Sequence, residues 1–175
     1  MKKFELTNEF ITNSYGVKLF RIKALIEFGN VKAGDLGGYI EKEENLSHMG
    51  DAWIYGDAQI SGNAQVFGDA QVFGNAWVFG DARVSGNARV SGDAWVFGDA
   101  RVSGDKDYAY AHGFGSCNRT TTFFRLKDGD VGVRCGCFYG TLAQFRDKVC
   151  ETHGETKKAQ EYLMLADLME IRFKN

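Results

Sequence analysis

Proline is absent from this 175-residue sequence, although it makes up about 5% of an average protein. Glycine occurs 22 times, well above its average share of about 7%. Disordered and collagen-like chains are rich in proline, so its absence argues against both classes. Many glycines without proline favour a regular, hydrogen-bonded β structure that turns through many tight corners.

Long apolar runs are absent as well. No stretch of about 18 apolar residues occurs, so the sequence predicts no transmembrane helix and no membrane partner. Residues 1–5 include two lysines but no apolar segment of the kind that a secretory signal needs, and we expect no such signal. The four cysteines are irregularly spaced and predict no disulfide framework, which favours a reducing cytoplasm as the protein's location.

The middle of the chain is a six-residue repeat. Nine copies follow one another without a gap from Gly50 to Ser103, the first reading GDAWIY and the last GDARVS. In each copy, the alternation of Ala, a variable residue, and Val or Ile predicts a short strand with the apolar residues inside. The Gly followed by Asp or Asn tolerates left-handed backbone angles and suits a corner. Short strands separated by regular corners predict a parallel β-helix.

This repeat resembles the hexapeptide-repeat family, in which an aliphatic residue, a nearby glycine and a small residue recur. The segment Val66-Phe67-Gly68-Asp69-Ala70-Gln71 carries the pattern, and all nine copies match it. The resemblance implies a left-handed parallel β-helix with three copies per turn. We therefore expect a mainly β protein in which residues 50–105 form about three turns.

Three copies per turn place residues 18 positions apart above one another and sort the outward side chains into three faces. The first face carries Trp53, Tyr55, Gln71, Phe73, Arg89 and Ser91. The second face contains four stacked aromatic residues, called the aromatic ladder below: Trp77, Phe79, Trp95 and Phe97. The third face ends as an Arg/Ser surface formed by Arg83, Ser85, Arg101 and Ser103.

The aromatic ladder is too large an apolar patch to leave in water. We expect it to be the interface of a homotrimer or higher oligomer, or to be covered by the terminal segments of its own chain; a stacking platform for a base or a sugar is the alternative. Arg83 and Arg101 are either an exposed solubilising pair or an anion clamp. Residues 50–105 carry three arginines against seven aspartates, a net charge of −4, so we expect no DNA partner.

The two ends of the chain lack the repeat. Residues 1–49 predict an N-terminal β cap that hides the first open edge of the coil, with Phe20, Ile22, Ala24 and Ile26 on one face of a strand. Residues 106–175 predict a small ββαα domain. Its strands run over residues 120–126 and 131–137 and are joined by a tight turn. Its helices begin at Leu142, after a Thr141 capping box, and at about Lys157, and the first is expected to bury Leu142, Phe145 and Val149. The second helix is apolar at Ala159, Tyr162, Ala166, Met169 and Phe173.

Segments in both ends extend the resemblance to hexapeptide-repeat proteins of phages and prophages. The segments are Asp35-Leu36-Gly37-Gly38-Tyr39-Ile40, residues 115–124 from Gly115-Ser116-Cys117 to Phe124, Cys135-Gly136-Cys137-Phe138, and Gly140-Thr141. Such proteins are commonly labelled transferases or polymer-forming proteins. The resemblance implies an accessory role in an infected or lysogenic bacterial cell, directed against host defence.

The most promising polar cluster combines residues around the start of the first predicted strand of this domain with the residue that begins its first predicted helix. It consists of Ser116, Asn118, Arg119 and Thr121, together with Thr141. A helix N-terminus offers free N–H groups to an anion, and an arginine adds a bidentate contact to phosphate or carboxylate. The alternative is that Thr141 only caps its own helix and that the other threonines are ordinary strand residues.

Enzymatic chemistry has weaker support. The acyltransferases of the hexapeptide-repeat family use a histidine as general base between the subunits of a trimer, yet residues 50–103 contain no histidine. The three histidines are His48, His112 and His153, for which ordinary structural roles are expected. Cys117, Cys135, Cys137 and Cys150 include a single C-x-C pair, a weak metal signal, so buried free thiols are expected rather than a metal site.

These observations predict a non-catalytic oligomeric binding protein that captures a small anionic ligand, such as a nucleotide signal, without a cofactor. The candidate ligand-binding residues are Ser116, Asn118, Arg119, Thr121, Thr141, Arg83 and Arg101. A hexapeptide-family acyltransferase and a purely structural oligomerisation scaffold are the alternatives.

Overall fold

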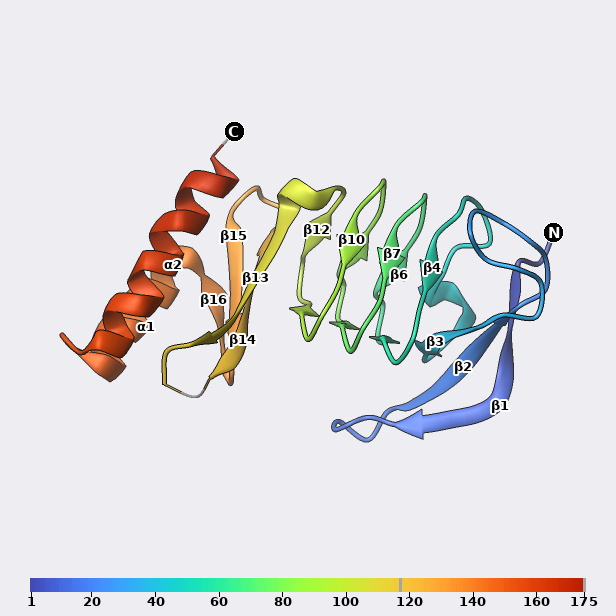
Figure 1. The fold of residues 1–175 in the computed structure, drawn as a ribbon, viewed down its shortest axis with the longest axis horizontal. Coiled ribbons are helices and arrows are strands. Elements are labelled where there is room, and N and C mark those ends of the chain that lie inside the picture. Colours follow the sequence, from blue (N-terminus) through green and yellow to red (C-terminus); the bar gives the residue numbers. More distant parts are fainter. Residues whose placement is uncertain (117, 175) are drawn as a thin grey trace. The chain divides into compact units, whose positions relative to one another are not determined.

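The computed structural model describes residues 1–116 and 118–174. The chain divides into two compact units, residues 1–105 and residues 106–175. The first is a β-solenoid with an N-terminal hairpin, and the second is an antiparallel sheet with two helices (Figure 1).

The solenoid consists of two-residue strands stacked on three faces (Figure 1). One face contains β5 (Gln59–Ile60), β8 (Trp77–Val78) and β11 (Trp95–Val96). The second contains β4 (Trp53–Ile54), β7 (Gln71–Val72) and β10 (Arg89–Val90), and the third β6 (Gln65–Val66), β9 (Arg83–Val84) and β12 (Arg101–Val102). All pairs within these faces are parallel and join residues 18 apart, which confirms the register predicted from the repeat.

The inside of the coil is made of small and β-branched side chains. Every Ala of the repeat, from Ala52 to Ala100, is fully buried, and so are the Val and Ile residues two positions later. The corner glycines adopt positive φ; Gly74, for example, has φ +74° and stacks so closely on Gly92 that an added Cβ would lie 3.0 Å from its backbone nitrogen. Both the conformation and the spacing therefore require glycine.

The coil begins before the regular repeat does. Strand β3 (Leu36–Ile40) pairs in parallel with β5, joining Tyr39 to Gln59, and Leu46 forms a parallel bridge to Val66. The solenoid therefore has about four turns instead of the three that we expected. The repeat pattern did not predict the additional turn, because its paired residues are 20 positions apart instead of 18 and because it contains the 3₁₀ turn Glu43–Asn45.

The remaining N-terminal residues form an antiparallel hairpin of β1 (Phe4–Thr12) and β2 (Lys18–Ala24). Strand β2 pairs with β3, so the hairpin extends one face of the solenoid into a six-stranded sheet. Lys3, just before β1, is 1% exposed and donates from Nζ to the carbonyl oxygens of Gly50 (3.1 Å) and Ala52 (2.8 Å). The two carbonyl oxygens lie at the first edge of the repeat. Without the bonds from Lys3 they would be buried and unpaired.

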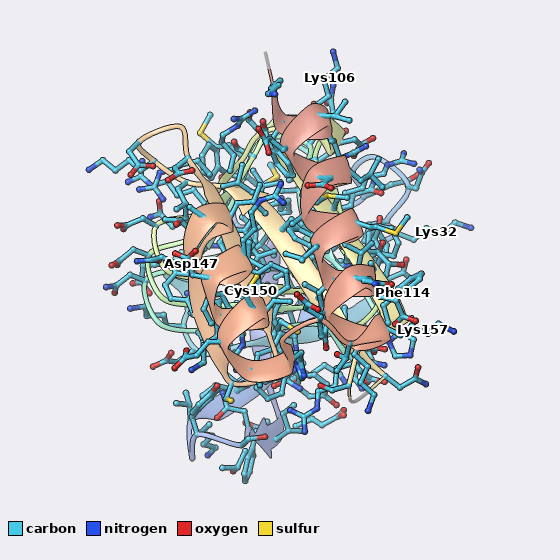
Figure 2. All side chains as sticks on the ribbon, turned by 90° about the vertical axis from the view of Figure 1, so that its left-hand side faces the viewer. Lys32, Lys106, Phe114, Asp147, Cys150 and Lys157 are labelled. Carbon is cyan, nitrogen blue, oxygen red and sulfur yellow. The ribbon has the colours of Figure 1, made fainter. Side chains whose placement is uncertain are left out.

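The C-terminal unit has four antiparallel strands in the order β13 (Tyr108–Phe114), β14 (Arg119–Arg125), β15 (Val131–Cys135) and β16 (Phe138–Thr141). A short 3₁₀ turn, Asp105–Asp107, precedes them. Helices α1 (Leu142–His153) and α2 (Lys157–Phe173) follow and lie side by side, as Figure 2 shows with Cys150 on α1 and Lys157 at the start of α2. No helix in the described part of the chain is both long and apolar enough to cross a membrane.

Both predicted helices and the β14–β15 hairpin are confirmed, but two strands were missed. The expected ββαα arrangement is in fact ββββαα, because β13 and β16 pair with the outer edges of the predicted hairpin. Strand β16 has only four residues, and the second predicted strand ends at Cys135 instead of Cys137. Cys137 therefore lies in the turn between β15 and β16 and does not share a strand with Cys135.

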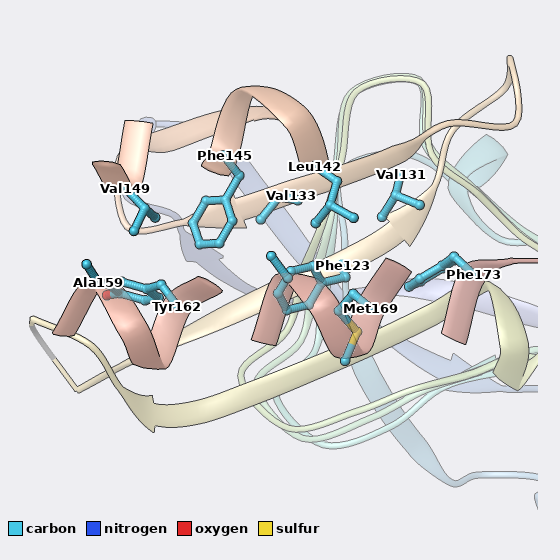
Figure 3. Close-up of a cluster of buried hydrophobic side chains, with 11 residues drawn as sticks. Phe123, Val131, Val133, Leu142, Phe145, Val149, Ala159, Tyr162, Met169 and Phe173 are labelled. Atoms are coloured by element: carbon cyan, nitrogen blue, oxygen red, sulfur yellow. The ribbon is translucent and has the colours of Figure 1, made fainter. Parts of the chain in front are cut away.

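The helices bury one face against the sheet. The core cluster joins the strands to both helices (Figure 3) and consists of Phe123, Val131, Val133, Leu142, Phe145, Val149, Ala159, Tyr162, Ala166, Met169 and Phe173. At the start of α1, Thr141 accepts a bond from the Gln144 backbone N–H (3.3 Å), and the Gln144 side chain accepts one from the Thr141 N–H (2.9 Å). This reciprocal pair is the predicted capping box.

Candidate ligand-binding site

A cavity of about 240 Å³ lies in the C-terminal unit, beside the turn from β15 to β16. Its apolar lining consists of Val149 and three aromatic residues, Phe138, Phe145 and Tyr162. Its polar lining comes from three elements and includes Ser116, Arg119, Lys148, Thr152 and His153. Among the described residues that line it, none is Asp or Glu. The cavity therefore combines an apolar wall with a cationic rim, a composition that favours an anion with an apolar part.

Arg119 is the first residue of β14, and its side chain lies against the turn between β15 and β16. An added Cβ at Gly136 would lie 2.8 Å from Nη1 of Arg119, so the guanidinium lies directly against the glycine. Gly136 has φ +59°, a conformation that a side chain would strain. Gly136 therefore adopts the backbone conformation that the turn needs and leaves room for the Arg119 side chain at the cavity.

Helix α1 contributes one of its faces to the cavity. Phe145, Lys148, Val149 and Thr152 all line it, and Phe145 and Val149, like Lys148 and Thr152, are four residues apart and so share one helix face. Phe145 and Val149 are also buried in the core, whereas Lys148 is exposed and its Nζ lies 2.8 Å from the Glu151 carboxylate. Because this ion pair is solvent-exposed, it constrains the lysine only weakly.

Tyr162 of α2 forms the inner wall. Its hydroxyl oxygen accepts the Ser116 backbone N–H at 3.2 Å, and its ring packs against Gly115, where any Cβ would overlap the ring. Burial raises the pKa of Tyr162, and hydrogen bonding to Cys135 adds to this effect while the bond from Ser116 opposes it. The phenol is consequently a neutral group at physiological pH. His153 stacks on the ring with centroids 5.8 Å apart.

Thr121 lies behind the cavity wall. Its side chain is 1% exposed, and its Oγ1 donates to Cys135 Sγ at 3.2 Å. Cys135 in turn lines the cavity. Thr121 therefore orients a wall residue and is not accessible to a ligand itself.

The structure brings together only part of the predicted polar cluster. Ser116 and Arg119 line the cavity, whereas Asn118 is exposed in the turn before β14 with φ +51° and is not among the lining residues. Thr141 caps α1, as the alternative prediction held, and it does not line the cavity either. Cys117, part of the segment that carries the resemblance, lies outside the described residues.

Arg83 and Arg101 belong to the other unit. They are paired directly across β9 and β12 on the third face of the solenoid. Nη1 of Arg101 donates to the carbonyl oxygens of Asp81 (2.9 Å) and Ala100 (2.8 Å), so this guanidinium is partly used within the coil. Arg83 is exposed.

The aromatic ladder is formed as the repeat predicts. Trp77 stacks on Trp95 with centroids 4.8 Å apart and planes at 6°, and Phe79 stacks on Phe97 at 4.8 Å and 8°. Tyr15, in the turn between β1 and β2, contacts Trp77 (6.2 Å) and Phe79 (5.9 Å). The chain's own N-terminal hairpin therefore covers part of the ladder.

The three histidines are held in structural contacts. Nδ1 of His48 accepts the Lys3 backbone N–H (3.2 Å), its Nε2 lies 2.7 Å from Glu43, and its ring stacks on Phe4. Hydrogen bonds from Lys2 and, second, from His48 hold the pKa of Glu43 below its usual value. With both ring nitrogens engaged, His48 is not available as a general base.

His112 contacts a hydroxyl and His153 an aromatic ring. His112 Nδ1 lies 2.9 Å from Thr120 Oγ1, and His153 stacks on Tyr162. Cys135, Cys137 and Cys150 are free thiols, but the expectation that they are buried is wrong, because Cys137 and Cys150 are exposed and Cys135 is half-buried. Within the described residues, no three His, Cys, Asp or Glu side chains are close enough together to hold a metal ion.

Lys148 and Thr152 were missed by sequence reasoning. The sequence could have indicated both residues. Phe145 and Val149 were predicted to be buried, and Lys148 and Thr152 each follow one of them by three residues, which places them beside the same helix face. Tyr162 and Phe145 were assigned to the core alone. That these core residues also face a cavity depends on the turn between β15 and β16, which the pattern did not reveal.

Residues 82–97 match a family model described as the YdcK beta solenoid repeat. The matched stretch covers β9, β10 and β11, and so contributes one strand to each face of the coil. Together with the stacked parallel strands, this match defines a repeat β-solenoid protein. A search of curated proteins found no match.

Proposed function

We propose that this protein is a non-catalytic binding protein that captures a small anionic ligand, such as a nucleotide, in the cavity of its C-terminal unit. The observation that carries the proposal is the composition of the cavity lining, in which Arg119 and Lys148 lie beside three aromatic rings without an acidic residue among the described lining residues. Charged hydrogen bonds to an arginine are stronger than neutral ones and suit phosphate or carboxylate.

The proposal is tested by titrating uridine 5′-monophosphate into the full-length protein by calorimetry. Replacing Arg119 with Ala removes a charged donor from the cavity and is expected to weaken binding by about tenfold or more. Arg83→Ala is the matched control, because it removes the same charge from the exposed solenoid face. Weaker binding with Arg83→Ala and unchanged binding with Arg119→Ala would move the site to the solenoid and overturn the proposal.

We further propose that the coil is of the left-handed hexapeptide type, that the protein forms a homotrimer or higher oligomer, and that it acts in the cytoplasm of an infected or lysogenic bacterial cell by sequestering a signal of host defence. The six-residue repeat with its 18-residue register supports the coil type. The stacked aromatic ladder supports assembly. The segments that resemble phage and prophage proteins support the cellular setting.

A second candidate function is a structural scaffold, which the aromatic ladder favours. Under that function, Trp77→Ser together with Trp95→Ser removes the stacked indoles and is expected to convert an oligomer to monomers, as measured by sedimentation velocity. Gln65→Ser on the third face is a control that leaves the ladder intact. The same sedimentation coefficient for the double variant and the unaltered protein would contradict an interface at the ladder.

A further inference from the structure

We infer that the outward side of helix α2 is the interface of an antiparallel twofold dimer, in which it packs against the same side of α2 in a second copy of this chain. The interface is formed by Met164, Leu168 and Ile171, called the α2 stripe below, with Glu161 and Arg172 beside it. None of these residues lines the C-terminal cavity or belongs to the aromatic ladder, so the inference goes beyond the proposed function.

The α2 stripe leaves three large apolar side chains in water. Met164 is 71% exposed, Leu168 54% and Ile171 70%. Their spacing of four and three residues places them one above another on a single side of the helix. The core residues of α2, among them Tyr162 and Met169 (Figure 3), point the opposite way, since each residue turns the helix by about 100°. A helix that is apolar on two opposite sides is typically covered on both.

The charges beside the α2 stripe favour a second copy as the partner. Glu161 and Arg172 lie about three helical turns apart and therefore border the same side of the stripe, one near each end. A twofold axis that packs two α2 helices antiparallel places Glu161 of each copy opposite the partner's Arg172, which gives two pairs of opposite charge. In a parallel pair each Glu161 would lie about three turns away from the partner's Arg172, so only the antiparallel order supplies these ion pairs.

Both charged residues are restrained within the C-terminal unit. Oε2 of Glu161 accepts the Gly115 backbone N–H at 2.8 Å, and Nη2 of Arg172 donates to the Tyr108 carbonyl oxygen at 3.2 Å. These bonds hold the two side chains beside α2. They therefore lower the conformational entropy that the ion pairs of a dimer would otherwise cost.

The other side of the α2 stripe is compatible with the same arrangement. Asp167 lies near the middle of the stripe, where the twofold axis brings it close to the partner's Asp167. Arg146 of α1 offsets this repulsion, because its Nη1 lies 2.6 Å from Asp167 and its Nη2 lies 2.9 Å from Glu170. A membrane surface is less suited as the partner. Helices that lie on membranes carry mainly Lys and Arg beside their apolar side, whereas Glu161 and Asp167 border this one.

Disulfide trapping in the full-length protein tests the contact. In the antiparallel pair Met164 lies opposite the partner's Ile171, whereas the two copies of either residue are about 10 Å apart along the helices, too far for a disulfide. The oxidised double variant Met164→Cys/Ile171→Cys is therefore expected to run as a covalent dimer on a non-reducing gel. Each single variant is expected to run as the unaltered protein does, which also supplies the background from the chain's own cysteines.

Charge reversal tests the pairing by sedimentation equilibrium. Glu161→Arg and Arg172→Glu are each expected to raise the dissociation constant of the twofold contact about fivefold or more, and the variant with both changes is expected to restore it, because opposite charges then face each other again. Met164→Lys places a charge in the stripe and is expected to abolish the contact. Met49→Lys is the matched control, because Met49 is also highly exposed (81%) but lies outside α2.

Every other outcome overturns the inference in a defined way. Covalent dimers of the single variants would indicate a parallel pair. No trapping of the double variant, or an unchanged dissociation constant for Met164→Lys, would show that a second copy does not cover the α2 stripe. Binding of the unaltered protein to phosphatidylglycerol vesicles that Met164→Lys abolishes would assign the stripe to a membrane. Ligand binding in the cavity is measured separately, so this inference and the proposed ligand binding fail independently.

Discussion

Lys3, at the edge of the coil, is a buried cation close to two aspartates. Lys3 is buried against Gly50 and Ala52, and burial lowers its pKa from the ordinary 10.5 to about 8, while Asp51 and Asp69 act in the opposite direction. The lysine thus donates to two backbone oxygens and partly neutralises two aspartates that neighbour each other on adjacent turns. Its position explains why an otherwise costly buried cation occurs in the N-terminal segment.

The lowered pKa of Lys3 predicts a pH dependence of stability. Between about pH 8 and pH 10.5 the unfolded chain keeps the lysine proton while the folded protein loses it, so the free energy of unfolding rises with pH by up to about 3 kcal/mol. Denaturant unfolding of the protein and of Lys3→Met over this range measures the effect as the difference between the two curves. A difference that stays constant, or that falls with pH, would contradict the account.

Asparagines at two corners of the coil each donate a hydrogen bond to the aspartate on the next turn. Asn75 lies between Asp57 and Asp93 in one column of corners, and its Nδ2 donates to Asp93 Oδ1 at 3.0 Å. Asn63 donates in the same way to Asp81 at 3.1 Å. Because parallel strands stack about 4.8 Å apart, an unbroken column of aspartates would place carboxylates next to one another. Asn63 and Asn75 therefore each relieve one such contact, whereas Asp51 and Asp69, and likewise Asp81 and Asp99, remain neighbours in their columns.

At the scale of elements, the turn between β15 and β16 links the fold to the candidate site. Gly136→Ala is expected to destabilise the protein by about 1–2 kcal/mol, because a Cβ at positive φ is strained. It is also expected to weaken the binding of uridine 5′-monophosphate, because the same Cβ would lie 2.8 Å from Nη1 of Arg119 and displace it. Thermal unfolding and calorimetry measure the two effects.

A matched control comes from the neighbouring hairpin. Gly129, in the turn between β14 and β15, has φ +91° and no atom within 4 Å of an added Cβ. Gly129→Ala therefore introduces backbone strain without touching the cavity, and it is expected to lower stability while leaving binding unchanged. Equal loss of binding in both variants would show that Gly136 does not act through Arg119.

Elements differ in how well the sequence predicted them. The strands of the regular coil were predicted to the correct register because each copy repeats both the inward pattern and the corner. Helices α1 and α2 were predicted because the capping box at Thr141 and the apolar spacing from Ala159 to Phe173 are local signals. Strands β13 and β16 were missed because they are stabilised mainly by pairing with β14 and β15, a non-local property.

At the scale of the whole molecule, the chain combines a repetitive unit with an irregular one. The solenoid stacks identical turns, so its structure follows from one copy and a period. The cavity follows from no repeat, because it requires β14, the turn after β15, and both helices to meet. Sequence reasoning accordingly found Ser116 and Arg119 as polar residues of interest but did not place them with Lys148 or with the aromatic wall.

The central claim, that the C-terminal cavity holds a small anionic ligand, is tested most directly by native mass spectrometry of protein purified gently from cells. The account predicts an oligomer that carries one small-molecule mass per chain, with an acidic compound released on denaturation. It also predicts that Arg119→Ala, purified in the same way, assembles equally but carries no such mass. The same bound mass in Arg119→Ala and in the unaltered protein would contradict the claim.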